Sequence, residues 1–110
     1  MTIVLVGNKH NKTMTYETAI SQAPVVLIEF YASWCPHCQG MMPIVDQVKE
    51  LLDGDVPVIQ LDVDNNKELS KQENIESIPT FIVYKDGREA WRHSGEIDGN
   101  ALLAKVQSYQ

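Results

Sequence analysis

The sequence predicts a three-layer α/β sandwich around a central mixed β-sheet, with the element order β-α-β-α-β-α-β-β-α. Three features of the chain lead to this prediction. Strand-like runs alternate with helical patterns, and a helical crossover between two strands makes them parallel. Residues 25–31, VVLIEFY, are almost continuously apolar, as expected of a strand covered on both faces. Near the C-terminus, Asp86-Gly87 separates two more strand-like runs, which predicts an antiparallel hairpin.

The N-terminal part of the chain predicts one strand and one short helix ahead of the central strand. Residues 2–6, TIVLV, form a β-branched run that Gly7 and Asn8 close, and this pattern favours a strand. Thr15 is suited to cap a helix that ends at about Gln22, because its hydroxyl can accept a hydrogen bond from the first turn.

The longest helical pattern runs from Pro36 to about Leu52. Pro43 lies inside it, and we expect a kink there because a proline nitrogen cannot donate the helical hydrogen bond. We expect Gly54 to end the helix. The apolar residues that repeat on one side of this pattern are Met42, Val45, Val48 and Leu52.

The C-terminal half predicts the remaining elements of the sandwich. Residues 56–63 are a strand pattern, and residues 66–74 are a polar helix pattern. The hairpin comprises residues 80–85 and 88–93, since Asp-Gly readily adopts the positive φ angles of a two-residue turn. A last amphipathic helix over residues 98–109 is expected to bury Leu102, Leu103 and Val106.

Length and charge narrow the classes of function. The 110 residues suit a single domain, 1–110, and show no linker or repeat. The net charge is −6, and the nine Lys and Arg residues are scattered, which argues against a nucleic-acid partner. No run approaches the roughly 20 apolar residues of a membrane helix. The N-terminus lacks the basic start of a signal peptide, so we expect a cytoplasmic protein, unless Met1 replaces a removed leader.

Cys35 and Cys38 are the only cysteines, and they are separated by two residues. A covalent haem would need a histidine directly after the second cysteine, where Gln39 stands. A disulfide used only as a staple would close too small a loop to stabilise the fold much. Metal sites are further alternatives: zinc with histidines, or copper with methionines, from the set His10, His37, His93, Met41 and Met42. The spacing does not favour a zinc site, and methionines on an apolar helix face are usually core residues and not copper ligands.

Redox chemistry explains this spacing better. Cys35 lies where the strand 25–31 passes into the long helix, and free N–H groups at a helix N-terminus stabilise a thiolate. Pro36 fits the first helical turn. Cys38 lies one turn further on the same side, within reach of Cys35. Cys35 is therefore predicted to attack a substrate disulfide, and Cys38 to resolve the mixed disulfide.

Three segments, FYASWCPHCQGMMP, SIPTFIVYKDGR and SGEIDGNAL, resemble the thioredoxin family, and the similarity extends over nearly the whole chain. The resemblance implies the thioredoxin fold and reduction of disulfides in other proteins. It also implies a redox-active Cys35–Cys38 disulfide with no separate cofactor, and a thioredoxin reductase as a partner. In the site, it implies that Trp34 flanks the thiols, that Ile78-Pro79 is a cis peptide bond at the substrate groove, and that Gly95 keeps this groove open.

Glu29 departs from the family pattern, in which a buried aspartate usually lies below the second cysteine. A carboxyl in an apolar strand should have a raised pKa, and we predict that it accepts the proton of Cys38. The alternative is a strand end that reaches solvent. Gln60 replaces a lysine that often pairs with the aspartate, which alters the charge balance and favours a neutral Glu29.

His37 is the second departure. Thioredoxins usually carry Gly-Pro between the cysteines, whereas Pro36-His37 resembles the periplasmic disulfide-forming oxidases. A histidine in the first helical turn can donate a hydrogen bond to the Cys35 thiolate. Its cationic form would lower the pKa of Cys35 further and make the disulfide more oxidising. The alternative is a solvated histidine with little influence.

The leading hypothesis is a monomeric thiol–disulfide oxidoreductase that reduces protein disulfides, with no nucleic-acid or membrane partner. Two others stay open. Pro36-His37 alone supports a disulfide oxidase or isomerase in an oxidising compartment. A non-catalytic module that binds a peptide beside Pro79 is the third, and an intact Cys-x-x-Cys argues against it.

Overall fold

The computed structural model describes residues 2–6 and 12–110. The expectations for Gly7 and Asn8 as the end of a strand, and for His10 as a candidate zinc ligand, lie outside the described residues. None of the described helices is both long and apolar enough to cross a membrane.

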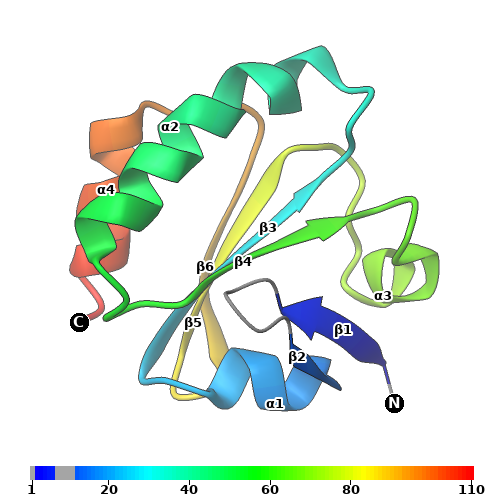
Figure 1. The fold of residues 1–110 in the computed structure, drawn as a ribbon, viewed down its shortest axis with the longest axis horizontal. Coiled ribbons are helices and arrows are strands. Elements are labelled where there is room, and N and C mark those ends of the chain that lie inside the picture. Colours follow the sequence, from blue (N-terminus) through cyan, green and yellow to red (C-terminus); the bar gives the residue numbers. More distant parts are fainter. Residues whose placement is uncertain (1, 7–11) are drawn as a thin grey trace.

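The central sheet is mixed, as predicted, and its strand order is β4-β3-β5-β6 (Figure 1). β3 pairs in parallel with β4 and antiparallel with β5, which pairs antiparallel with β6. All but the last residue of β3 are buried, because helices cover both of its faces. The strands are β3 (Val25–Tyr31), β4 (Val58–Asp62), β5 (Thr80–Lys85) and β6 (Arg88–Ser94).

Two helices lie on each side of this sheet, which confirms the three-layer sandwich (Figure 1). On one face, α2 and α4 pack on Leu27 and Phe81. On the other, α1 and α3 pack on Ile28 and Ile82. The alternation of neighbouring residues along each strand produces these two cores. The helices are α1 (Tyr16–Ser21), α2 (Pro36–Leu52), α3 (Lys67–Gln72) and α4 (Gly99–Gln107).

The N-terminal region contains a strand that the sequence did not predict. The expected first strand is present as β1 (Ile3–Val6), but it pairs antiparallel with β2 (Lys12–Thr15) in a separate two-stranded sheet. The observed order therefore has one strand more than the prediction. The segment KTMT was not predicted because it is short and mostly polar, and because its last residue, Thr15, is also the cap of the following helix. That cap is confirmed, since the Thr15 hydroxyl accepts from the N–H of Thr18 at 3.1 Å.

The long helix α2 differs from the prediction in its buried side and in its end. It runs through Pro43 without a break. Met41 is buried and Met42 is half exposed, so the expectation that Met42 faces the core is wrong. Met41 keeps the spacing of four residues to Val45, which places both on one side, whereas Met42 lies about 100° away. The helix ends at a left-handed Asp53, one residue before the expected Gly54.

The remaining elements agree with their predictions apart from their ends. The strand expected over residues 56–63 and the helices over residues 66–74 and 98–109 are each shorter by one or two residues at each end. Asp98, for example, is outside α4 because its carboxylate caps the helix by accepting from Ala101 N–H at 3.1 Å. The hairpin turn is confirmed, with positive φ at both Asp86 and Gly87.

Candidate functional site

Both cysteines lie where β3 passes into α2. Cys35 is the N-cap of α2, and its Sγ accepts a hydrogen bond from the backbone N–H of Cys38 at 3.4 Å. Pro36 is the first residue of the helix, where a missing N–H removes no helical bond. Both thiols are free and almost completely buried, and they form a small cluster with Ala32. The helix start thus brings the two sulfur atoms together, as the spacing predicted.

The two thiols have unequal acidity. Burial acts to raise the pKa of Cys35, but hydrogen bonds from the side chain and N–H of Cys38 and from the N–H of His37 bring it below its usual value. Burial raises the pKa of Cys38 to about 12, and the nearby charges of Cys35 and Glu29 add to this effect. The arrangement favours a thiolate on Cys35 and a protonated thiol on Cys38.

The segment 73–79, which leads into β5, lies opposite the thiols and is called the wall below. The Ile78-Pro79 peptide bond is cis, and the carbonyl oxygen of Ile78 lies 3.9 Å from Cys35 Sγ. Gly95 donates its N–H to the carbonyl of Pro79 at 2.7 Å. Its φ angle of 99° favours glycine, and a Cβ there would meet no described atom within 4 Å. The backbone conformation, rather than space inside the fold, therefore accounts for glycine at this position in the free protein.

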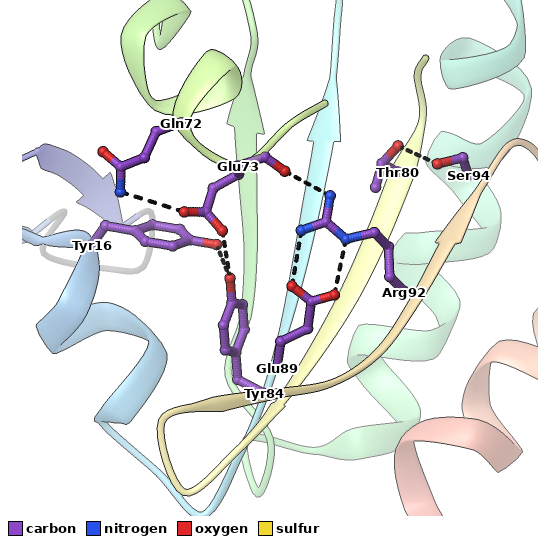
Figure 2. A network of polar contacts seen from close by, with 8 residues as sticks. All are labelled: Tyr16, Gln72, Glu73, Thr80, Tyr84, Glu89, Arg92 and Ser94. Carbon is purple, nitrogen blue, oxygen red and sulfur yellow. Dashed lines mark hydrogen bonds and ion pairs between the residues drawn. The ribbon is translucent and has the colours of Figure 1, made fainter. Parts of the chain in front are cut away.

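Hydrogen bonds hold this wall at both of its ends (Figure 2). At the start, Arg92 donates to the backbone carbonyl of Glu73 at 2.7 Å, just after α3. At the end, the hydroxyl of Thr80 donates to the carbonyl of Ser77 at 2.6 Å and lies 2.9 Å from the hydroxyl of Ser94. Both anchors come from β6 or β5, so the rigid sheet positions the wall against the thiols.

Trp34 directly precedes Cys35 in the chain and lies at the surface. Its side chain is largely exposed, and its indole N–H donates to the carboxylate of Asp64 at 2.7 Å. A pocket of about 220 Å³ lies between Trp34 and the wall, with Ile75 and Ile78 among its apolar lining residues. An exposed indole next to an apolar hollow is suited to contact a peptide segment.

Glu29 is enclosed in the central strand, with 1% of its surface exposed. The alternative that this position reaches solvent is therefore wrong. Burial raises the pKa of Glu29 to about 7, with an opposing hydrogen bond from Gln60 at 2.9 Å and a further raising effect from Asp46. The charge of Glu29 in turn raises the pKa of Cys38. Glu29 can therefore change its protonation state near neutral pH, close enough to the second thiol for its charge to act on it.

The ring of His37 is paired with Glu96, across from the start of α2. Its Nδ1 lies 2.5 Å from a carboxylate oxygen of Glu96, and both side chains are more than half exposed. The contribution of His37 to the low pKa of Cys35 comes from its backbone N–H. The expectation that the ring donates to the Cys35 thiolate differs from this geometry, because the ring Nδ1 is paired with the carboxylate of Glu96.

Two residues of the site, Asp64 and Glu96, were not predicted. Each hydrogen-bonds a predicted residue, Trp34 or His37, from a loop that is distant along the chain. No local pattern marks either carboxylate, since exposed acidic residues are common along this acidic chain. Over residues 2–6 and 12–110, no group of three or more His, Cys, Asp or Glu side chains is arranged to hold a metal ion.

Comparison with known proteins gives consistent matches. The family model described as Thioredoxin matches residues 7–108. The curated relative Thioredoxin Y, chloroplastic, from Oryza sativa subsp. japonica is 36% identical over 88 residues, which cover 80% of this chain and 52% of the relative. A Synechocystis protein named Thioredoxin is 33% identical over 89 residues, which cover 81% of this chain and 82% of the relative. A mutant thioredoxin structure from Halobacterium salinarum NRC-1 has a TM-score of 0.77 and 33% identity, covering 84% of this chain and 80% of that one.

The plant relatives are longer than the matched region. The chain spans about half the length of three of them, with coverage of 52%, 50% and 48%. The family model nevertheless extends over nearly all of this chain, and it includes the paired cysteines and the wall beside them. The chain belongs to the thioredoxin family.

Proposed function

We propose that the chain is a thiol–disulfide oxidoreductase that reduces disulfides of other proteins through Cys35 and Cys38. The unequal acidity of the two thiols is the observation that carries this proposal. A thiolate attacks disulfides and a thiol does not, so an acidic Cys35 at the helix N-terminus is suited to begin the exchange. Cys38 stays protonated until the mixed disulfide has formed.

The reaction proceeds in two exchanges. The Cys35 thiolate attacks one sulfur of a substrate disulfide, forms a mixed disulfide and releases the other substrate sulfur as a thiolate. Cys38 then loses its proton and attacks Cys35 Sγ, which releases the second substrate thiolate. The substrate gains two electrons, and the protein is left with a Cys35–Cys38 disulfide. These two cysteines are the redox centre, and the exchange itself requires no separate cofactor.

Glu29 is proposed as the proton acceptor for Cys38. Its pKa of about 7 lets it be ionised in part at neutral pH, and it is enclosed near a thiol whose pKa is about 12. Transfer of the Cys38 proton to Glu29 would produce the second thiolate only where Cys35 Sγ is adjacent. Pro36 and His37 tune the first thiol: Pro36 starts the helix, and the backbone N–H of His37 stabilises the thiolate.

The substrate is proposed to bind as an extended segment along the wall. Backbone groups of Ile78, next to the cis bond with Pro79, would pair with it as an added strand. Trp34 and the apolar pocket beside it would contact its side chains. Gly95 forms the far edge of this groove.

The direction of electron flow is proposed to be net reduction by a monomer, with electrons supplied by a thioredoxin reductase. The ring of His37 is paired with Glu96 instead of Cys35, which favours this direction over the oxidase alternative. Net reduction requires a reducing compartment. The cytoplasm is the expected one, and the chloroplastic relatives make the plastid a second candidate.

Reduction of insulin by dithiothreitol tests this function. The wild-type chain should accelerate the reaction, and Cys35→Ser should abolish the acceleration, because the remaining thiol, Cys38, is buried and has a raised pKa. Cys38→Ser is the matched variant: it should retain the attack and accumulate mixed disulfides with insulin. A wild-type rate equal to that of dithiothreitol alone, with no gain from a thioredoxin reductase and NADPH, would contradict the proposal.

A further inference from the structure

The contact between His37 and Glu96 connects two elements that border the thiols. His37 is in the first turn of α2, and Glu96 is in the loop between β6 and α4, directly after Gly95. The ring Nδ1 and the carboxylate Oε2 are 2.5 Å apart. The loop itself is held in place, because His93 Nε2 lies 3.1 Å from the backbone oxygen of Glu96.

The carboxylate of Glu96 lies over the start of α2. A Cβ added to Gly40 would be 3.9 Å from its second oxygen, Oε1. This negative charge acts on Cys35, whose pKa it raises, whereas the N–H groups of the same helix turn lower it. Glu96 and the Cys35 thiolate therefore compete for the positive end of one helix.

The same carboxylate determines where the imidazole points. A histidine cation between two reactive cysteines stabilises the thiolate and makes the disulfide more oxidising. Here the hydrogen bond of the ring is directed to Glu96, and an adjacent carboxylate offsets the charge of a protonated ring. His37 and Glu96 together add no net charge beside Cys35 when both are ionised.

We propose that Glu96 is a positioning residue that holds the His37 ring away from Cys35 and offsets its charge, which keeps the Cys35–Cys38 pair reducing despite the Pro36-His37 sequence. The inference rests on the proposed function, in that it takes Cys35 as the thiol whose ionisation sets the redox equilibrium. One exposed glutamate would then determine how strongly reducing the Cys35–Cys38 pair is.

Replacing Glu96 by glutamine should remove the charge that offsets a protonated His37 and let the ring interact with the Cys35 thiolate. In Glu96→Gln, Cys35 should titrate at a lower pH than in the wild type, and reduced glutathione should reduce the Cys35–Cys38 disulfide more completely. The equilibrium constant should rise roughly two- to fivefold, the range expected for an exposed charge pair. Thiolate absorbance against pH measures the titration, and equilibration in glutathione buffers measures the constant.

A double-mutant cycle separates positioning from a simple charge effect. It uses Glu96→Gln, His37→Ala and the double variant, with Glu50→Gln as the matched control at an exposed glutamate near the other end of α2. The shift caused by Glu96→Gln should shrink in the His37→Ala background, and Glu50→Gln should equal the wild type. The proposal fails if Glu96→Gln equals the wild type or becomes more reducing. It also fails if the shift is the same without His37.

The result is independent of the test of function. Equilibration with glutathione involves only the Cys35–Cys38 pair and needs no protein substrate. A chain that does not reduce insulin would overturn the proposed function, and the cycle would still report whether Glu96 controls His37.

Discussion

Each face of the central sheet encloses a polar site, and the two sites respond differently to the same burial. On the α2 face, Glu29 is enclosed with a hydrogen bond from Gln60. On the face covered by α1 and α3, the hydroxyls of Tyr16 and Tyr84 are 2.7 Å apart, and Tyr84 donates to Glu73 at 3.2 Å (Figure 2). Loss of hydration raises the pKa of Glu29 and of both tyrosines.

The starting pKa determines what burial does to function. A carboxyl moves from 4.5 to about 7, into the range where it can exchange a proton at neutral pH. A phenol starts at 10.0 and moves further from neutrality, so Tyr16 and Tyr84 remain neutral. Burial therefore makes Glu29 a candidate for proton transfer and leaves the tyrosines as structural hydrogen-bonding groups.

Replacement of Glu29 by leucine should give the largest effect, a change in how the stability of the fold depends on pH. If that dependence did not change, the contrast between Glu29 and the tyrosines would be wrong. Between pH 4.5 and about 7 the unfolded chain releases the Glu29 proton while the folded protein keeps it. The folded state binds more protons there, so its stability falls as the pH rises, by on the order of 3 kcal/mol. In Glu29→Leu this part of the pH dependence should disappear, as measured by urea unfolding of the reduced protein across this range.

The same variant tests the role of Glu29 in exchange. Resolution of the mixed disulfide should slow more than the first attack, because only resolution needs the Cys38 proton to leave. Glu29→Gln is the matched control for shape, since it keeps a hydrogen-bonding side chain and cannot titrate. Equal slowing of attack and resolution in stopped-flow kinetics would contradict the assignment.

Replacement of Tyr84 by phenylalanine should give a smaller effect of a different kind. It removes a buried hydroxyl that bonds both Tyr16 and Glu73, and should lower the free energy of unfolding by about 1–3 kcal/mol. The loss should be the same from about pH 5 to pH 8, because the raised pKa values of Tyr16 and Tyr84 keep both hydroxyls neutral in that range. A loss that changed with pH, or a changed Cys35 titration, would show that this site is coupled to the redox centre.

Replacement of Asp46 by asparagine should give the smallest effect and would sharpen the account of Glu29. The charge of Asp46, on α2, raises the pKa of Glu29, so its removal should lower that pKa slightly. Carboxyl carbon chemical shifts measured by NMR against pH report the change directly. Glu50→Gln serves as the control on the same helix. A pKa of Glu29 that did not fall in Asp46→Asn would contradict a raising effect of the Asp46 charge.

Much of the fold and the reactive pair could be predicted from the sequence, because local chemistry controls both. The Thr15 cap, the Asp86-Gly87 turn and the apolar run of β3 each depend on residues within a few positions of one another. The position of Cys35 at the start of α2 follows from the same local pattern. The sequence also predicted that Glu29 is enclosed, because it lies in an apolar strand, and that its pKa is raised in consequence.

The errors and omissions have a common physical origin. Met41 replaces Met42 in the core because the rotation of α2 about its axis depends on what it packs against. β2 forms because β1 pairs with it, although its own sequence is weakly strand-like. Asp64 and Glu96 reach the site from distant loops.

Apart from β2, the chain order of strands and helices can be read along the sequence, because caps, turns and periodicity act over a few residues. The same holds for the adjacent thiols and the acidic residue in the central strand. The partner of His37 cannot be read in this way. His37 and Glu96 are 59 positions apart, and they meet only because β6 and α2 are packed in one sandwich. Whether that histidine contacts the thiolate or a carboxylate depends on the packed structure, since interactions over a few residues of sequence do not specify contacts between distant elements.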